Sequence, residues 1–367
     1  MNFNTFLSLI PDKGTFCLKN VVLIVFYSGL FSSCYYRSDK NDETGKMVAS
    51  IDTRSGQVYI NDNNKPVLRY NYEMVYEDDV YAFNGMGANE YVATAVDSFM
   101  TNPSIYAVPR SNYIHPVFGL NDEILTRDWS KDHPHHRGIY WAWPEVNLGS
   151  ERSDIHALQK VFARPTGRIK VENGKDFAQI EAENIWITEK GVNTIVREHS
   201  LIRAYRQTEY GRIIDLAFLF EGLKDSVTIA RRGTDKYGGL NIRMMTPKGQ
   251  EISYHNDDEG HIPRRSWSDL SGVFAGNEGS SGMTVFQHNQ NPQYPGDWVE
   301  YPDLSWVQPT FPGAGNRFEL KPGEPLVLRF RILVHTGMKP DVQVLNKLWD
   351  EYHSDKNPEL KFTLRKF

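Results

Sequence analysis

The sequence predicts a mainly β protein: a large antiparallel two-sheet sandwich with one C-terminal helix. Runs of alternating apolar and polar residues recur from about Met47 onward, and turn-forming residues separate them. No helices interleave with these runs, which favours antiparallel sheets over crossover connections. The span 47–367 is also long for a small immunoglobulin-like sandwich, so we expect larger sheets with elaborated loops.

The expected strands follow one another along the chain. VYINDNNKPVLRY holds two strand-like runs around the turn-rich NDNN, and FAQIEAENIWITEKGVNTIVREHSLIRAYR alternates until the turn signal EKG interrupts it. IIDLAFLFEG, GMTVFQH and LVLRFRILVH add further strands. The last run predicts one apolar and one polar face, formed by Leu326, Leu328, Phe330, Ile332 and Val334 and by Arg329, Arg331 and His335.

The C-terminal helix is expected to begin at Pro340-Asp341. Beyond this point Leu345, Leu348, Trp349 and Tyr352 recur at helical spacing. Such a stripe predicts that one side of the helix packs on the β body.

The N-terminus has the features of a secretory signal. Lys13 and Lys19 precede the apolar run VVLIVFYSGLF, which is too short to span a bilayer but suits a signal peptide. FSSC resembles a permissive lipobox of bacterial lipoproteins, so Cys34 is the expected lipid attachment site. An ordinary buried thiol at Cys34 is the alternative. We expect a signal peptide over 1–33, a flexible tether over 34–46 and a single large β-sandwich domain over 47–367, anchored by lipid in the bacterial cell envelope, in the outer membrane and facing the periplasm or the surface.

Composition excludes other classes of protein. The net charge is −5, 40% of residues are hydrophobic and 24% are charged, which is typical of a folded chain rather than a disordered one. Strongly basic patches do not recur, so we expect no nucleic-acid partner. The sequence has 2 cysteines, Cys17 and Cys34, and a mature exported chain would therefore have no disulfide.

The run DHPHHRG places three histidines and an arginine in one short stretch. If it stays extended, His133, His135 and Arg137 share one side and His136 lies on the other. Gly138 then permits a tight bend before IYWAW, and Glu145 follows. Three interpretations remain open: ligands for a metal, acid/base groups with arginine binding an anion, or a structural set of buried polar contacts.

Three further stretches have a similar mix of histidine, aspartate, asparagine, arginine and tryptophan. They are DKYGGLNIR, SWSDLSG and QHNQNPQYPGDWVEY. Each alone suits a turn or a packing role. Together with DHPHHRG they indicate a polar pocket with aromatic walls, which suits sugars because hydroxyls pair with planar polar groups and C–H faces stack on indoles.

These motifs carry a resemblance. YIHPVFGLNDEILTRDWSKDHPHHRGIYWAW, YGGLNIR, SWSDLSG and HNQNPQYPGDW together resemble a PmoA-like (methane-oxygenase-labelled) bacterial family of unknown function, over about residues 50–340. The resemblance implies a galactose-mutarotase-like super-sandwich with a sugar-binding sheet face. It implies proton transfer by His135 or His136 with Glu145 or Asp269. The label itself does not fit, because methane monooxygenase subunits span membranes and nothing after residue 31 is apolar enough to do so.

The leading functional prediction is a lipid-anchored carbohydrate-active protein, a glycan-directed hydrolase or lyase that requires no cofactor. Its catalytic candidates are His135, His136, Glu145, Asp269 and His288. Its substrate-binding candidates are His133, Arg137, Trp141, Trp143, Tyr237, Arg243, Asn291 and Trp298. One alternative is a non-catalytic surface glycan-binding lipoprotein. Another is an enzyme that depends on a divalent metal held by His133, His135 and His288.

Overall fold

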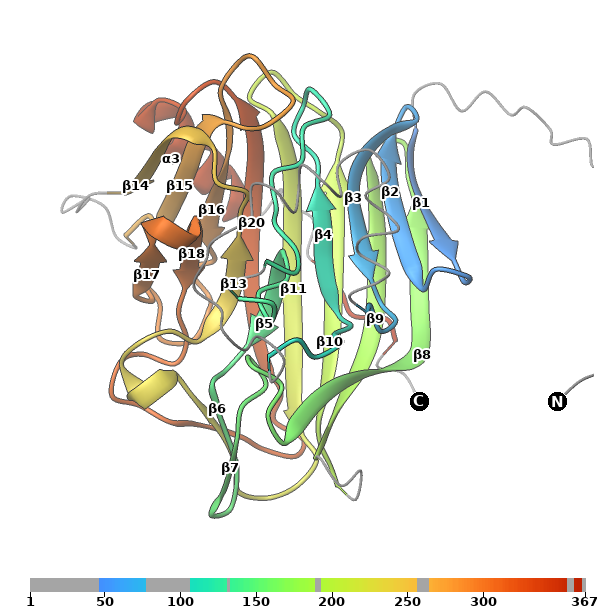
Figure 1. Cartoon of the computed structure of the whole chain (residues 1–367), viewed down its shortest axis with the longest axis vertical. Helices are drawn as coiled ribbons and strands as arrows, with labels where there is room; N and C mark the ends of the chain where they lie inside the picture. The colour runs from blue at the N-terminus through green and yellow to red at the C-terminus, as the bar shows by residue number, and fades with distance from the viewer. Residues whose placement is uncertain are drawn as a thin grey trace, which may run out of the picture. The chain divides into compact units, whose positions relative to one another are not determined.

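The computed structural model describes residues 46–76, 106–130, 133–188, 193–255, 264–354 and 360–364. Within these ranges the chain is mainly β, in three antiparallel sheets with one C-terminal α-helix (Figure 1). The expected signal peptide, Cys34 and nearly all of the expected tether lie outside the described residues. None of the helices in the described ranges has the length and apolar character needed to cross a membrane.

The two large sheets have eight strands each. In spatial order, the first contains β1 (Met47–Asp52), β2 (Gln57–Asp62), β3 (Lys65–Asn71), β4 (Tyr113–Val117), β5 (Ile139–Ala142), β13 (Gly239–Arg243), β18 (Trp306–Pro309) and β17 (Trp298–Tyr301). The second contains β14 (Lys248–Tyr254), β15 (Trp267–Val273), β16 (Ser281–Gln287), β20 (Leu326–Thr336), β11 (Arg212–Gly222), β10 (Thr194–Tyr205), β9 (Phe177–Thr188) and β8 (Val161–Asn173).

A third, four-stranded sheet adds to the two-sheet sandwich that the sequence predicts. It contains β19 (Phe318–Leu320), β12 (Val227–Ala230), β6 (Glu145–Leu148) and β7 (Glu151–Ser153). Two short 3-10 turns, η2 (Arg232–Thr234) and η3 (Pro302–Leu304), interrupt the connections between strands. Strands β6 and β7 of the third sheet follow β5 directly in the chain and lie in the lower part of Figure 1.

The two strand-like runs predicted around NDNN are confirmed, and they pair as a hairpin. Val58 to Asp62 pair with Lys65 to Tyr70 in β2 and β3. Asn63 and Asn64 both have a left-handed φ, at 50° and 66°, and asparagine tolerates this conformation better than most residues.

The core lies between the two large sheets. The Trp141 ring on β5 lies 5.4 Å from that of Phe218, 5.3 Å from that of Phe220 and 5.7 Å from that of Phe330. These phenylalanines belong to β11 and β20, so the Trp141 side of β5 faces the second sheet. Because side chains alternate along a strand, Tyr140 lies on the opposite side, here called the outer face of the first sheet.

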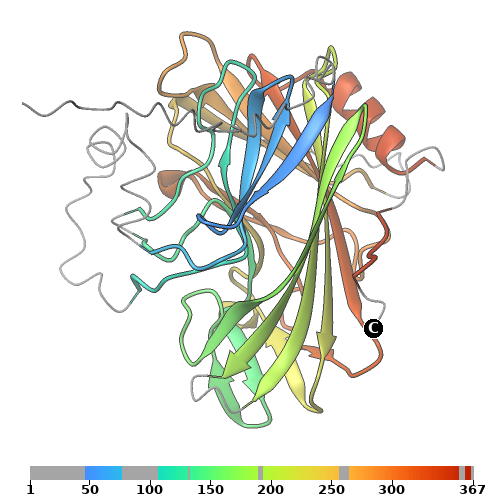
Figure 2. The same cartoon turned by 90° about the vertical axis from the view of Figure 1, so that its right-hand side faces the viewer.

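The apolar face predicted for LVLRFRILVH is confirmed in β20, where Leu326, Leu328, Phe330, Ile332 and Val334 all belong to the core between the sheets. The opposite face carries Val327 and Leu333 besides the predicted polar residues, so it is polar only in part. The predicted helix is α3 (Val342–Tyr352), with Asp341 at its N-cap position and the four predicted residues buried. It packs on Trp267, Phe286 and Leu333, on the outside of the second sheet (Figure 2).

Candidate functional site

The histidine-rich run forms a turn, so the extended geometry considered for it is wrong. The backbone N–H of His136 donates to the carbonyl oxygen of His133 at 2.9 Å. Pro134 occupies the second position of this turn, where its fixed φ is favourable. The turn brings the rings of His133 and His136 to 4.7 Å between centroids, and those of His135 and His136 to 4.6 Å.

Gly138 joins the turn to β5, as the sequence indicates. Its φ is 57°, and a Cβ added there would lie 2.2 Å from the carbonyl oxygen of Ile114. Only glycine suits this conformation and this close approach. The backbone of β5 therefore begins directly against β4.

Strand register then places a set of polar and aromatic side chains next to the turn. Tyr140 pairs with Asn241 across β5 and β13, and Arg243 pairs with Trp306 across β13 and β18. Cross-strand partners share a face. All four side chains therefore lie on the outer face of the first sheet, and all are buried.

A third histidine reaches this face from another turn. His156 lies between β7 and β8, where Asp154 Oδ1 accepts the backbone N–H of Ala157 at 2.8 Å. Arg110 donates to the carbonyl oxygens of Ile155 and His156, which holds the turn in place. The Tyr140 hydroxyl lies 3.2 Å from Nε2 of His156.

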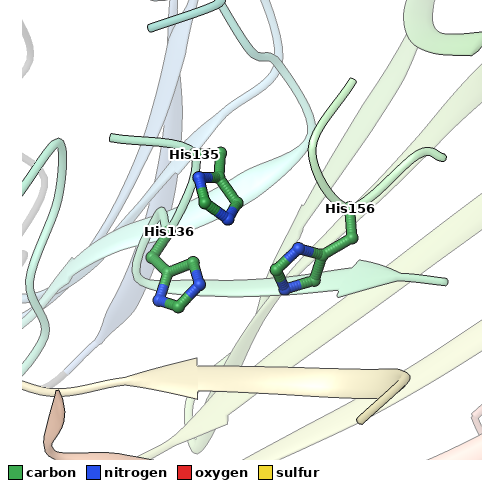
Figure 3. Close-up of side chains that lie close together, drawn as sticks. All are labelled: His135, His136 and His156. Carbon is green, nitrogen blue, oxygen red and sulfur yellow. The ribbon is translucent and has the colours of Figure 1, made fainter. Parts of the chain in front are cut away.

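His135, His136 and His156 form what we call the imidazole cluster (Figure 3). One nitrogen from each ring lies within 4.8 Å of the others, and His136 and His156 are buried. The three rings point toward one another from two turns that lie about 20 positions apart in the sequence. A set of imidazole nitrogens at this spacing is suited to a transition-metal ion such as zinc.

Aromatic side chains border the cluster. The Trp306 ring lies 4.7 Å from that of His136, and the Tyr237 ring lies 5.2 Å from that of His156. Tyr301 stacks on Trp306 at 5.1 Å with an angle of 19° between the planes. Tyr237 and Tyr301 are half-buried, so this side of the cluster includes rings that solvent reaches.

Burial and neighbouring charge keep His136 and His156 neutral. Burial holds the pKa of His136 well below its usual range, and His135, His156 and Arg243 lower it further. Burial also holds the pKa of His156 well below its usual range, with His135, Arg110 and Arg232 contributing in the same direction. A neutral imidazole is the form that ligates a metal.

Carboxylates on the surrounding segments are bound to guanidinium groups. The pairs are Asp128 with Arg137, Asp154 with Arg232 at 2.7 Å, and Glu145 with Arg152 at 3.1 Å and with Arg317. Burial alone would raise the pKa of Glu145, but the hydrogen bonds from Arg317 and from the Gly233 backbone outweigh this and lower it. Glu145 therefore lacks the raised pKa that a general acid needs at neutral pH.

The predicted site residues fall into two groups. His133, His135, His136, Tyr237 and Arg243 lie at or beside the cluster, and their catalytic or binding roles stay predictions. The other candidates lie elsewhere or are held by internal contacts.

Trp141 and Trp143 do not line the site, which corrects their assignment as substrate-binding residues. Both face the core, where the Trp143 ring lies 5.0 Å from that of Phe220, and its Nε1 donates to the carbonyl oxygen of Phe311 at 2.6 Å. The alternation along IYWAW is as predicted, but the face turned to the cluster is the one that carries Tyr140.

Arg137 serves the interior rather than a ligand. It is fully buried, pairs with Asp128, and donates to the Tyr113 hydroxyl at 2.8 Å. Its guanidinium lies 4.0 Å from the centre of the Trp129 ring. The guanidinium charge of Arg137 is therefore neutralised by Asp128 inside the protein, which corrects its assignment as a substrate-binding residue.

Asp269 lies on the far side of the sandwich. It is fully buried on β15 and accepts a hydrogen bond from Thr284 at 2.7 Å, and Nε2 of His335 lies 2.9 Å from its carboxylate. Leu270, the next residue on β15, belongs to the core between the sheets, so Asp269 faces outward. The core between two packed sheets is about 10 Å thick, which separates Asp269 from the cluster.

Three candidates from the stretch around His288 also lie apart from the cluster. Its ring lies 4.8 Å from that of Tyr352 and 4.6 Å from that of His353, beside α3. Asn291 exchanges two 2.8 Å hydrogen bonds with the backbone of Arg329, and Trp298 Nε1 donates to Ser266 at 3.0 Å. A metal site built on His133, His135 and His288 is therefore wrong.

Sequence reasoning missed His156 and Trp306. His156 stands alone in DIHAL, where nothing in the pattern distinguishes it from a core histidine. In WVQP, Trp306 shares a face with the polar Gln308, whereas Val307 lies on the other face. This pattern was the available signal that Trp306 faces away from the core.

The fold and this site define an antiparallel β-sandwich protein with a histidine-centred site. Comparison with known families shows that the chain belongs to a family of unknown function (DUF6807), whose model matches residues 57–350. The resemblance to a PmoA-like family stays a prediction. No curated protein matches the sequence.

Two solved structures show a weak likeness to the chain. They are GH36 alpha-galactosidases from Geobacillus stearothermophilus: AgaA in complex with 1-deoxygalactonojirimycin, at 10% identity and a TM-score of 0.34, and AgaB, at 11% and 0.31. Each match covers 80% of this chain and 41% of the galactosidase chain, so this chain spans about two fifths of their length.

Proposed function

We propose that this chain is an exported, lipid-anchored carbohydrate-active protein of the bacterial cell envelope, and that it acts on glycans as a hydrolase or lyase. The proposed site is the imidazole cluster with Tyr237, Tyr301 and Trp306 beside it. The proposed chemistry belongs to the imidazoles, because the carboxylates on the surrounding segments are held by arginines.

One observation carries the proposal: three buried polar atoms without a hydrogen-bond partner among the described residues lie at the imidazole cluster, on the outer face of the first sheet. Nδ1 of His136, Nδ1 of His156 and Nε1 of Trp306 are buried, and none has a hydrogen-bond partner among the described residues. Such atoms are rare in folded proteins, and one explanation is a ligand that supplies the missing partners. A sugar ring fits the neighbouring surface, since its hydroxyls bind polar side chains and its C–H face stacks on tyrosine and tryptophan.

The test is affinity electrophoresis of the full-length protein on a panel of polysaccharides, with product analysis of the same mixtures. Wild type is expected to be retained by at least one glycan and to release products from it. Tyr237→Ala removes a half-buried ring from the site and is expected to abolish retention. Tyr210→Ala is the matched control, because Tyr210 is also half-buried but packs near α3.

Three outcomes separate the candidate functions. Retention with products supports the enzyme. Retention without products supports a glycan-binding lipoprotein instead. A folded wild-type protein that no glycan on the panel retains contradicts both.

The anchoring part of the proposal has a separate test. The apolar run before Cys34 supports a lipoprotein signal. Cells that express the wild-type chain are expected to incorporate a labelled fatty acid into it and to hold it in the membrane fraction. Cys34→Ala is expected to lose both the label and the membrane association. A wild-type chain without label contradicts the anchor.

A further inference from the structure

We propose that the imidazole cluster binds one divalent transition-metal ion, with zinc as the best fit, through one nitrogen each of His135, His136 and His156. This inference deepens the proposed function. Only the catalytic role of the ion rests on that proposed function. The binding of the ion itself follows from the geometry of this chain.

The spacing of the nitrogens permits closure on a metal. They lie within 4.8 Å of one another. In a tetrahedral zinc site, with zinc–nitrogen distances of 2.0–2.1 Å, ligand nitrogens are about 3.4 Å apart. The difference is about 1.4 Å at most, which small rotations of the side chains supply. His135 is half-buried on its turn and can move most easily.

The hydrogen bonds around His156 indicate which of its nitrogens binds. Nε2 faces the Tyr140 hydroxyl at 3.2 Å, whereas Nδ1 is buried without a hydrogen-bond partner among the described residues. A ligating histidine usually donates its other ring N–H to an oxygen, which fixes the tautomer and orients the ring. Tyr140 fits this supporting role, and the Arg110 guanidinium lies 4.6 Å above its ring.

The donor set determines the kind of ion. Three imidazole nitrogens suit zinc and its neighbours in the first transition row, while calcium and magnesium prefer oxygen. Three protein ligands are the pattern of catalytic zinc sites, in which a water or substrate oxygen takes the fourth position. Trp306 and Tyr237 border two of the three imidazoles, so a substrate oxygen that bound such an ion would come from the proposed sugar site.

The test uses the full-length chain, treated with a chelator and dialysed. Zinc is titrated against a chromophoric competitor, and cobalt is added to a second sample to record its visible spectrum. We expect one zinc per chain and the intense absorption of four-coordinate cobalt. His135→Ala and His156→Ala are expected to weaken zinc binding by more than the roughly 10–100-fold that loss of a supporting hydrogen bond costs, and Tyr140→Phe by about that amount.

His288→Ala is the matched control. His288 is half-buried like His135 but lies beside α3, so this variant should bind zinc as wild type does. Circular dichroism checks the fold of each variant, and His135→Ala decides the question if His156→Ala does not fold. Saturable binding that is lost in His135→Ala supports the site. Absence of saturable binding in wild type, or equal binding in His135→Ala, overturns it.

The experiment separates the two proposals. Zinc binding without retention on any glycan keeps the metal site and removes the proposed function. Product release by chelator-treated, metal-free protein keeps the proposed function and removes the ion from it.

Discussion

Replacing Trp141 and Trp143 by phenylalanine, one at a time, tests whether they serve the core or a ligand. Both rings contact Phe220, at 5.3 Å and 5.0 Å between centroids. They differ in one respect. Trp143 donates to the carbonyl oxygen of Phe311 at 2.6 Å, whereas Nε1 of Trp141 is buried without a hydrogen-bond partner among the described residues.

This difference sets the expected magnitudes. Each substitution removes roughly 40 Å³ of side chain, and at about 24 cal/mol per Å³ of cavity the cost is about 1 kcal/mol. Trp143→Phe also leaves the buried Phe311 carbonyl without its donor, which adds about 1–3 kcal/mol. Trp141→Phe leaves no such acceptor. We therefore expect Trp143→Phe to be destabilised by about 2–4 kcal/mol and Trp141→Phe by about 1 kcal/mol.

Urea unfolding of the full-length chain, with the slope m compared between variants, measures the difference. Glycan retention is recorded in the same preparations under conditions where both variants are folded, and it should match wild type. Equal unfolding midpoints for the two variants would refute the role given to the Phe311 hydrogen bond. Lost retention with unchanged midpoints would return the tryptophans to the binding site.

Three further predictions use the same unfolding assay. Gly138→Ala places a methyl group against the Ile114 carbonyl oxygen in a left-handed conformation, and should cost at least about 1–3 kcal/mol. Asp128→Asn removes the anion beside buried Arg137 and should cost about 3–5 kcal/mol at pH 7. Burial raises the pKa of Asp128, but Arg137 outweighs this and holds it below 3.8. The contribution of the ionised carboxylate is therefore complete above about pH 5 and is lost as pH falls below 3.8, so the midpoints of wild type and variant should converge in acid. Zinc at 100 times its Kd should stabilise wild type by about 2.7 kcal/mol and leave His135→Ala unchanged; equal shifts in both would contradict the site.

The strands and the helix were predictable because their signals are local. Alternation with a period of two assigned the inner face of β20 correctly, and a helical stripe located α3. The third sheet was not predicted. Its strands β19, β12, β6 and β7 are short, and three or four residues carry little periodicity.

The site was predicted in part, for a physical reason that its residues make clear. DHPHHRG marked His135 and His136, but the turn at Pro134 changed which rings meet. His156 joins them because long-range contacts hold the 154–158 turn beside β5, among them the hydrogen bonds from Arg110, far earlier in the chain. Contacts between residues so far apart in the chain depend on the topology of the fold, and the local sequence DIHAL does not predict them.

The same limit explains the error over the tryptophans. Both faces of IYWAW are aromatic or apolar, so composition alone did not tell which one faced the core. The strand register shows which face is which. Trp141 pairs with the apolar Leu240 on the core face, and Tyr140 pairs with the polar Asn241 on the outer face.

The pairing of the carboxylates limits how a glycan bond would be broken on this face. Hydrolysis or elimination needs a group that activates water or takes a proton. Glu145 is bound by Arg152 and Arg317, and Asp154 by Arg232, so neither is placed to serve without breaking an ion pair. An ion on the imidazole cluster would supply that group, because bound zinc lowers the pKa of its water to about 7. Glycan turnover should therefore stop on chelation while retention through Tyr237 and Tyr301 persists, and turnover that survives chelation would leave the imidazoles themselves as the proton-transfer groups.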